Sequence, residues 1–212
     1  MTDSSDHSDR ERADPAQATS TTLLELAKAG DASAWKQLAF VYTPLVRWWC
    51  RQQGIAAPQD AEDVTQEVLA AVAGKVGEFS RSATGSFRSW LYTITRHKTA
   101  DYFRRRGAVA AGGSDAQVQL EQLPAADSGS SWTAEGASER AILVRRALEL
   151  VRPEFQPRTW EAAWRVTVDE QRPADVGAEL GMTAAAVHTA KSRVLRRLRA
   201  LLADLLDEPP AA

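Results

Sequence analysis

The stretch from Arg172 to Arg199 constrains the fold of this chain most, because it carries the pattern of a helix-turn-helix. A short helix over residues 173–180 is predicted to end at Gly181, since glycine adopts the left-handed backbone of a helix C-cap at little cost. Thr183 is placed to cap a second helix with its hydroxyl oxygen. The pattern therefore predicts two helices joined by a tight turn, the second with one apolar face formed by Val187, Val194, Leu198 and Leu201.

The other face of this second helix is strongly basic, with no acidic residue before Asp204. A helix-turn-helix with a basic second helix is typical of proteins that read the DNA major groove. Side chains near the start of such a helix reach base edges, which here are Ala185, His188, Thr189 and Ser192. Cations further along suit phosphates, namely Lys191, Arg193 and Arg196, with Arg197 and Arg199 beyond them. A solvated basic face without DNA is the alternative interpretation.

The net charge conceals an uneven distribution of acidic and basic residues along the chain, and this distribution bears on which partners the chain can bind. The 212 residues have a formal charge of −2, yet residues 1–20 hold five acids against two arginines, and residues 107–137 hold four acids and no Lys or Arg. The one cysteine, Cys50, excludes disulfides within the chain and is expected to pack as a small apolar residue. No apolar run approaches the roughly 18 residues of a membrane span, and the polar, acidic N-terminus is unlike a signal peptide. We therefore expect a cytoplasmic protein with no membrane partner.

Helical periodicity with no lasting strand pattern predicts an all-α fold of two small helical domains. Gly30 is expected to end a first helix and Asp31 to cap the next, and Pro44 to mark a helix start or kink. The expected organisation is a disordered tail over 1–20, a helical domain over 21–106, a flexible acidic linker over 107–137, a helix-turn-helix domain over 138–206 and a short tail over 207–212.

Two further segments carry candidate sites. The segment DAEDVTQEV carries an acidic ridge of Asp60, Glu62, Asp63, Gln66 and Glu67. Of these, Asp63, Gln66 and Glu67 are predicted to share an outward face opposite Val64 and Val68. Docking on a basic partner and a simply solvated face fit this segment equally well. A metal site is disfavoured, because no second acidic cluster or nearby histidine closes a cage, and no cofactor is expected. The segment from Phe87 to Arg106 combines aromatic and basic side chains, which suits single-stranded DNA, although Trp90 and Phe103 are expected to lie in the core.

These three segments, in this order, resemble the bacterial RNA polymerase sigma factors of the extracytoplasmic-function (ECF) group. The resemblance implies that the acidic segment docks on the coiled-coil clamp of the largest polymerase subunit, and it adds the polymerase flap as a second contact. It implies that the segment from Phe87 to Arg106 melts and holds the promoter minus-ten element, and that the loop over 80–86 pockets a flipped base. It assigns minus-ten contacts to Ser86, Phe87, Arg88, Arg96, His97, Lys98, Arg104 and Arg105.

The resemblance also assigns the minus-35 element to the second helix of the helix-turn-helix, and it allows an inhibitory anti-sigma partner. Some residues depart from the family pattern. Gly177 stands where alanine is usual, His97 where asparagine is usual, and His188 and Thr189 replace a commoner basic residue and serine. The promoter sequence therefore cannot be transferred to this chain.

The function expected from the sequence is that of a promoter-specificity subunit, which performs no chemistry of its own. The main alternative is a stand-alone helix-turn-helix regulator, which would have no need of the acidic segment. A metal-dependent nuclease using Asp60, Asp63 and Glu67 is a more distant alternative.

Overall fold

The computed structural model describes residues 22–80, 86–110 and 134–206, and these residues form helices and no strand. The predicted all-α class is therefore confirmed. The tails, the centre of the loop over 80–86 and most of the predicted linker lie outside the described residues, so the domain division stays a prediction. The helices are α1 (Leu23–Lys28), α2 (Ala32–Gln52), α3 (Pro58–Lys75), η1 (Val76–Glu78), α5 (Phe87–Ala110), α7 (Ala134–Val151), η2 (Arg152–Glu154), α8 (Pro157–Thr167), α9 (Pro173–Leu180) and α10 (Ala184–Leu206).

The predicted helix ends are confirmed where a local cap decides them. The backbone N–H of Ala34 donates to Oδ1 of Asp31 at 2.7 Å, and Gly30 before it has a φ of 87°. In the helix-turn-helix, Gly181 follows α9 with a φ of 62°, and Oγ1 of Thr183 accepts the N–H of Ala186 at 3.1 Å. Each signal acts within four residues, which is why the sequence alone reveals it.

The prediction at Pro44 is wrong as a helix start, because α2 runs through it without interruption. Proline donates no backbone hydrogen bond, so one bond of the helix is lost there. Val41, Leu45 and Val46 around it are fully buried, and burying their apolar surface offsets that loss. The helix predicted to end at 106 also continues to Ala110.

The larger core centres on α2 and extends into both halves of the chain. The apolar face of α3 predicted at Val64 and Val68 is confirmed, since both are buried against α2, and Val72 extends it by one turn. The same core takes in Leu143 of α7 and Leu205 near the end of α10. A second, smaller core joins α8, α9 and the first half of α10 through Ala162, Val176, Val187 and Ala190.

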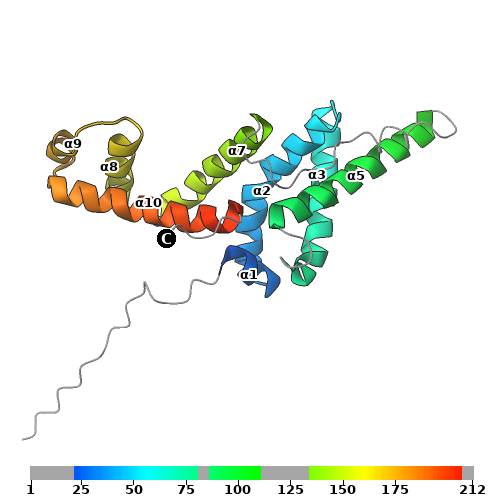
Figure 1. Cartoon of the computed structure of the whole chain (residues 1–212), viewed down its shortest axis with the longest axis horizontal. Helices are drawn as coiled ribbons and strands as arrows, with labels where there is room; N and C mark the ends of the chain where they lie inside the picture. The colour runs from blue at the N-terminus through cyan, green and yellow to red at the C-terminus, as the bar shows by residue number, and fades with distance from the viewer. Residues whose placement is uncertain (1–21, 81–85, 111–133, 207–212) are drawn as a thin grey trace, which may run out of the picture.

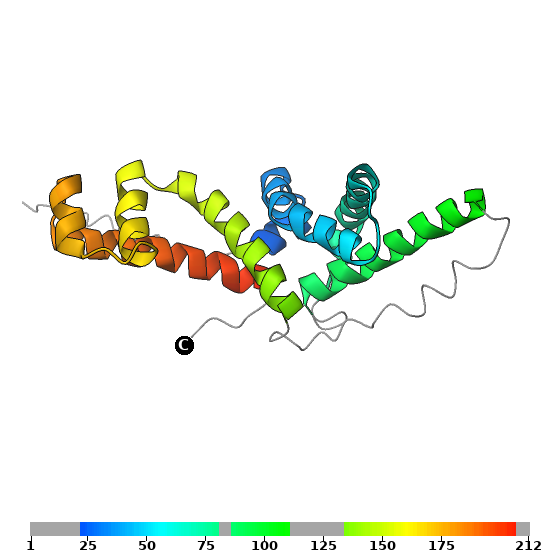
Figure 2. The ribbon, with the colours of Figure 1, turned by 90° about the horizontal axis from the view of Figure 1, so that it is seen from above.

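Helix α10 is therefore part of both cores. Its 23 residues span about 34 Å at 1.5 Å per residue. Figures 1 and 2 show α8 and α9 at one end of the molecule, α5 extending toward the other, and α10 running from α8 and α9 to α2. The second helix of the helix-turn-helix is thus the start of α10, and the far end of α10 is buried beside α2.

Cys50 packs in the larger core, as predicted, and is fully buried. This burial raises the pKa of its thiol, although hydrogen bonding with Thr99 and Thr65 acts in the opposite direction. A protonated thiol without solvent access is a packing group rather than a reactive one. Within the described residues, no helix has both the length and the apolar character that crossing a membrane requires.

The departure at Gly177 has a steric reason. A Cβ atom at this position would lie 2.6 Å from the carbonyl oxygen of Met182, closer than side-chain carbons come to a backbone oxygen. The contact is fixed, because the N–H of Met182 donates to the carbonyl oxygen of Gly177 at 2.7 Å across the turn. The tight turn of this helix-turn-helix therefore requires glycine here.

We expect Gly177→Ala to destabilise the helix-turn-helix by about 1–3 kcal/mol, because overpacking a close contact costs that much. Thermal unfolding followed by circular dichroism measures this. Gly74→Ala is the matched control, since its Cβ meets nothing within 4 Å and alanine favours the helix of α3. Equal melting temperatures for the two variants would contradict the steric explanation.

Candidate polymerase and nucleic-acid interfaces

The acidic ridge lies on α3, and only part of it faces solvent. Asp63 and Gln66 are exposed, whereas Asp60, Glu62 and Glu67 are half-buried against neighbouring helices. The sequence predicted an outward face of Asp63, Gln66 and Glu67, and the structure exposes the first two. The structure separates those that hold the fold together from those open to a partner.

Asp60 fastens α3 to α5. Its Oδ2 accepts a hydrogen bond from the Tyr102 hydroxyl at 2.5 Å and one from Nη1 of Arg106 at 2.6 Å. Arg106 also donates to the Tyr102 oxygen. Burial and the Asp60 carboxylate raise the pKa of Tyr102, so its hydroxyl keeps the proton that it donates. This carboxylate is therefore engaged within the fold.

Glu67 and Glu62 are also paired. Glu67 accepts from Nη2 of Arg105 at 2.8 Å and lies 3.6 Å from Nζ of Lys98, both on α5. Glu62 pairs with Arg47 of α2, and Nε2 of Gln66 donates to its Oε1 at 2.9 Å. The bond from Gln66, aided by Arg47, lowers the pKa of Glu62, which stays ionised at neutral pH.

Asp63 is left as the exposed carboxylate of the ridge. It makes no ion pair with any residue that the structure describes. Over the described parts of the chain, no three His, Cys, Asp or Glu side chains gather where they could hold a metal ion. The acids proposed for a nuclease site include Asp60 and Glu67, which are occupied by α5.

The structure does not expose Phe87 for its predicted minus-ten contact. Its side chain is only 2% exposed and packs edge-on against Tyr42, with ring centroids 5.2 Å apart, and against Phe79 at 5.4 Å. An aromatic residue at the start of a basic helix fits a core or a base stack equally well in sequence, and the register of α5 turns this one inward. Ser86 caps the helix instead, accepting the N–H of Ser89 at 3.1 Å.

The remaining predicted minus-ten residues are spread along α5. Trp90 and Phe103 pack against the larger core, as expected. His97 is exposed and Arg96 is half-buried, whereas Lys98 and Arg105 are paired with Glu67 and Arg104 with Asp101. Arg88 is held by Glu139 of α7, at 3.0 Å between Nη1 and Oε2. Many of the basic side chains of α5 are thus paired with carboxylates of the same chain.

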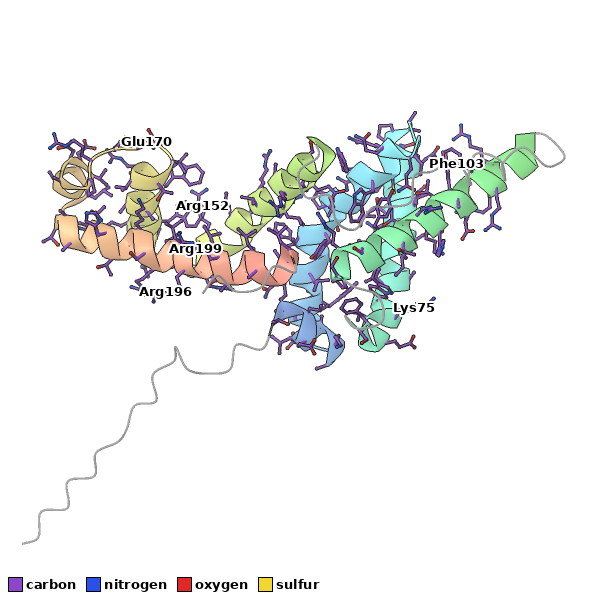
Figure 3. All side chains as sticks on the ribbon, viewed as in Figure 1. Lys75, Phe103, Arg152, Glu170, Arg196 and Arg199 are labelled. Carbon is purple, nitrogen blue, oxygen red and sulfur yellow. The ribbon has the colours of Figure 1, made fainter. Side chains whose placement is uncertain are left out.

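Most of the predicted minus-35 residues gather on one face of α10, whereas Arg193 lines the larger hollow described below. His188, Thr189, Ser192, Arg193 and Arg196 are exposed together with Ala185, and Lys191 is half-buried. A hollow of about 520 Å³ lies along this face, lined by His188, Lys191, Ser192, Leu195, Arg196 and Arg199; Figure 3 labels the last two. Arg197 is different, because its guanidinium donates two hydrogen bonds to the carboxylate of Glu154, at 2.7 and 2.8 Å.

A larger hollow, which the sequence did not predict, lies between α7, η2, α8 and α10. Its volume is about 1140 Å³, and its wall includes Trp160 and Trp164, stacked with ring centroids 6.2 Å apart. Trp164 is exposed, and Arg152, labelled in Figure 3, lies on the rim. The spacing of the two tryptophans, one helical turn apart, was the available signal. We call this hollow the tryptophan groove.

Comparison with known proteins identifies the family. Residues 41–109 match sigma-70 region 2, which covers most of α2 and all of α3 and α5 to within one residue of its end. The chain is 32% identical to the ECF RNA polymerase sigma factor ShbA of Streptomyces griseus over 190 residues, which cover 84% of this chain and 93% of that protein. It is 28% identical to the ECF RNA polymerase sigma factor BldN of Streptomyces coelicolor over 200 residues, covering 92% of this chain and 70% of that protein.

The likeness to ShbA runs through both halves of the chain and nearly the whole of that relative. The acidic segment, the basic aromatic helix and the helix-turn-helix are therefore parts of one protein type rather than a regulator with an unrelated first half. The chain belongs to the ECF RNA polymerase sigma factors of the sigma-70 family, which act in transcription initiation.

Proposed function

We propose that this chain binds core RNA polymerase and directs it to promoters, with α10 reading the minus-35 duplex and α5 holding the minus-ten element. The observation that carries the proposal is the polar and basic face of α10, exposed beside a confirmed helix-turn-helix turn. Family membership supports the role, and the geometry supports the choice of surfaces.

On α10, the proposed role of a residue depends on its position along the helix. Ala185, His188, Thr189 and Ser192 lie within its first nine residues and are proposed to meet base edges. Lys191, Arg193 and Arg196 are proposed to bind phosphates, which supply affinity but little sequence choice. Arg197 is omitted, because its guanidinium is engaged by Glu154.

On α5, the exposed His97 and the half-buried Arg96 are the best-placed candidates for the minus-ten strand, followed by Arg88 if it is released from Glu139. Exposed Arg104 and Arg105 would add phosphate contacts by exchanging a carboxylate for a phosphate. Phe87 is not part of this proposal. Melting would rely on these cations, which neutralise the backbone of the separated strand.

For the polymerase, we propose two contacts. Asp63, with Gln66 beside it, would dock on the clamp of the largest subunit, because it is the exposed, ion-pair-free acid of the ridge among the described residues. The flap would occupy the tryptophan groove, where Trp164 offers an exposed aromatic surface of the kind that anchors protein interfaces. The chain would then act without catalysing a reaction or binding a cofactor, and an anti-sigma factor is proposed as a further partner.

The experiment is binding of the full chain, assembled with core polymerase, to a promoter fragment at several salt concentrations. We expect Arg196→Ala to weaken binding to all sequences and to reduce the slope of log K against log salt by about one, because one phosphate contact is lost. His188→Ala should instead reduce discrimination at one base pair of the minus-35 element, by about 1–3 kcal/mol if it makes a direct contact.

Arg51→Ala is the control, since it removes the same charge from an exposed position on α2, remote from α10 in sequence and in the other half. Full promoter binding by the chain without polymerase, unaffected by polymerase addition, would favour the stand-alone regulator instead. Equal salt slopes for the Arg196 and Arg51 variants would overturn the assignment of α10.

A further inference from the structure

We propose that the free chain is closed by an internal clamp, in which Glu139 of α7 holds Arg88 of α5 and excludes the minus-ten strand from that arginine. The clamp rests on the proposed function, because it takes Arg88 as a minus-ten contact. The surface around Arg88 in the N-terminal half is therefore covered by the chain's own α7, until DNA and polymerase displace that helix.

Glu139 uses both carboxylate oxygens on residues of the other half. Its Oε1 accepts the indole N–H of Trp49 at 2.6 Å, and its Oε2 accepts from Nη1 of Arg88 at 3.0 Å. The side chains of Arg88 and Glu139 are only 24% and 17% exposed, so water and salt screen this pair less than a surface pair. A single residue of α7 thus touches α2 and α5 at once.

Three contacts beside Glu139 hold the same closure. The Tyr42 hydroxyl donates to the carbonyl oxygen of Leu205 at 2.7 Å and is buried. The guanidinium of Arg146 lies over the ring of Phe40, 4.7 Å from its centroid. Leu143, Ala147 and Leu205 complete the apolar contact. The closed arrangement is therefore a packed interface rather than one ion pair.

Closure and minus-ten binding compete for one group. Nη1 of Arg88 cannot donate in the same direction to Glu139 and to a phosphate, and the carboxylate of Glu139 would repel a phosphate placed beside it. DNA can therefore gain Arg88 only when the bond between Glu139 and Arg88 opens, and separating α7 from α2 would open it. By linkage, whatever separates α7 from α2 raises the affinity for the strand.

Glu139→Gln tests the clamp with little change of shape. The amide oxygen can still accept the Trp49 N–H, while the charge that holds Arg88 is lost. We expect the free chain to bind a minus-ten single strand about threefold to tenfold more tightly, in line with the loss of a half-buried charged hydrogen bond. Glu25→Gln is the matched control, because it removes the same charge from an ion pair with Lys28 of its own helix and touches none of the closure contacts.

A distance measurement tests closure apart from DNA. Spin labels at the exposed alanines of Ala70→Cys in α3 and Ala185→Cys in α10 report on the two halves, while native Cys50 is buried. We expect one narrow distance in the otherwise unchanged chain. Glu139→Ala combined with Tyr42→Phe should broaden it, and saturating minus-ten strand should do the same.

The outcomes separate the clamp from the proposed function. If Glu139→Gln changes neither strand affinity nor the distance distribution, while Arg88→Ala weakens minus-ten binding by the polymerase complex, the clamp is overturned and the function stands. A changed distance with unchanged affinity overturns the competition. If Arg88→Ala leaves minus-ten binding by the complex unchanged, the role of Arg88 fails, and the clamp fails with it.

Discussion

Asp63→Arg is expected to weaken binding of this chain to core RNA polymerase by roughly thirtyfold or more, equivalent to about 2 kcal/mol. The variant replaces the exposed carboxylate of the ridge with a cation, which turns an attraction into a repulsion if the docking surface is basic. The fold should tolerate the change, because Asp63 is exposed and makes no ion pair with a described residue. Some binding should remain if the tryptophan groove holds the flap independently. Titration of the purified chain over immobilised core polymerase measures the dissociation constant of each variant.

Glu78→Arg is the control for this experiment. It makes the same change of charge at an exposed position of η1, in the same half but outside the ridge. It should bind polymerase within about a factor of two of the unchanged chain, since single exposed charges contribute little. Equal losses for both variants would show that net charge, rather than docking at Asp63, controls binding.

Leu143→Ala is expected to destabilise the protein by about 2–5 kcal/mol, because truncating a fully buried leucine removes apolar contacts and leaves a cavity. The effect has a particular meaning here, since Leu143 lies on α7 but belongs to the core centred on α2. The cost should therefore appear in the unfolding of the N-terminal half as well. Urea denaturation followed by circular dichroism, with a constant m-value, gives the free energy of unfolding.

Leu26→Ala provides the comparison, because it removes the same atoms from a side chain that is 39% exposed. We expect a cost below about 1 kcal/mol for it, in keeping with surface substitutions. Similar costs for Leu26 and Leu143 would mean that α7 does not share the larger core in solution. Such a result would also remove the packed interface on which the clamp depends.

The sequence predicted what local physics decides. Asp31, Thr183 and Gly181 act on backbone groups within four residues, and the structure has each of them as expected. The apolar stripe of α3 was also evident, because a period of 3.6 residues shows which face is buried. It does not show which helix that face meets.

Contacts between distant residues could not be predicted in this way. Asp60 and Arg106 are 46 residues apart, and Trp49 and Glu139 are 90 apart, so no spacing in the chain signals either pair. The ridge was therefore predicted as one docking surface, although two of its five residues, Asp60 and Glu67, fasten α5. The burial of Phe87 was not predicted for a related reason, since its environment depends on the positions of Tyr42 and Phe79.

Because α10 belongs to both cores, a movement at one of its ends is transmitted to the other. Val187 fixes the reading end in the small core and Leu205 fixes the other end beside Tyr42. Over about 34 Å of stiff helix, a tilt of five degrees at the DNA end displaces the far end by about 3 Å, enough to break the Tyr42 hydrogen bond. If α10 reads the minus-35 element as proposed, seating it in a major groove at an imposed angle would shift its contact with α2. Binding of one promoter element would then prepare the half proposed to hold the other.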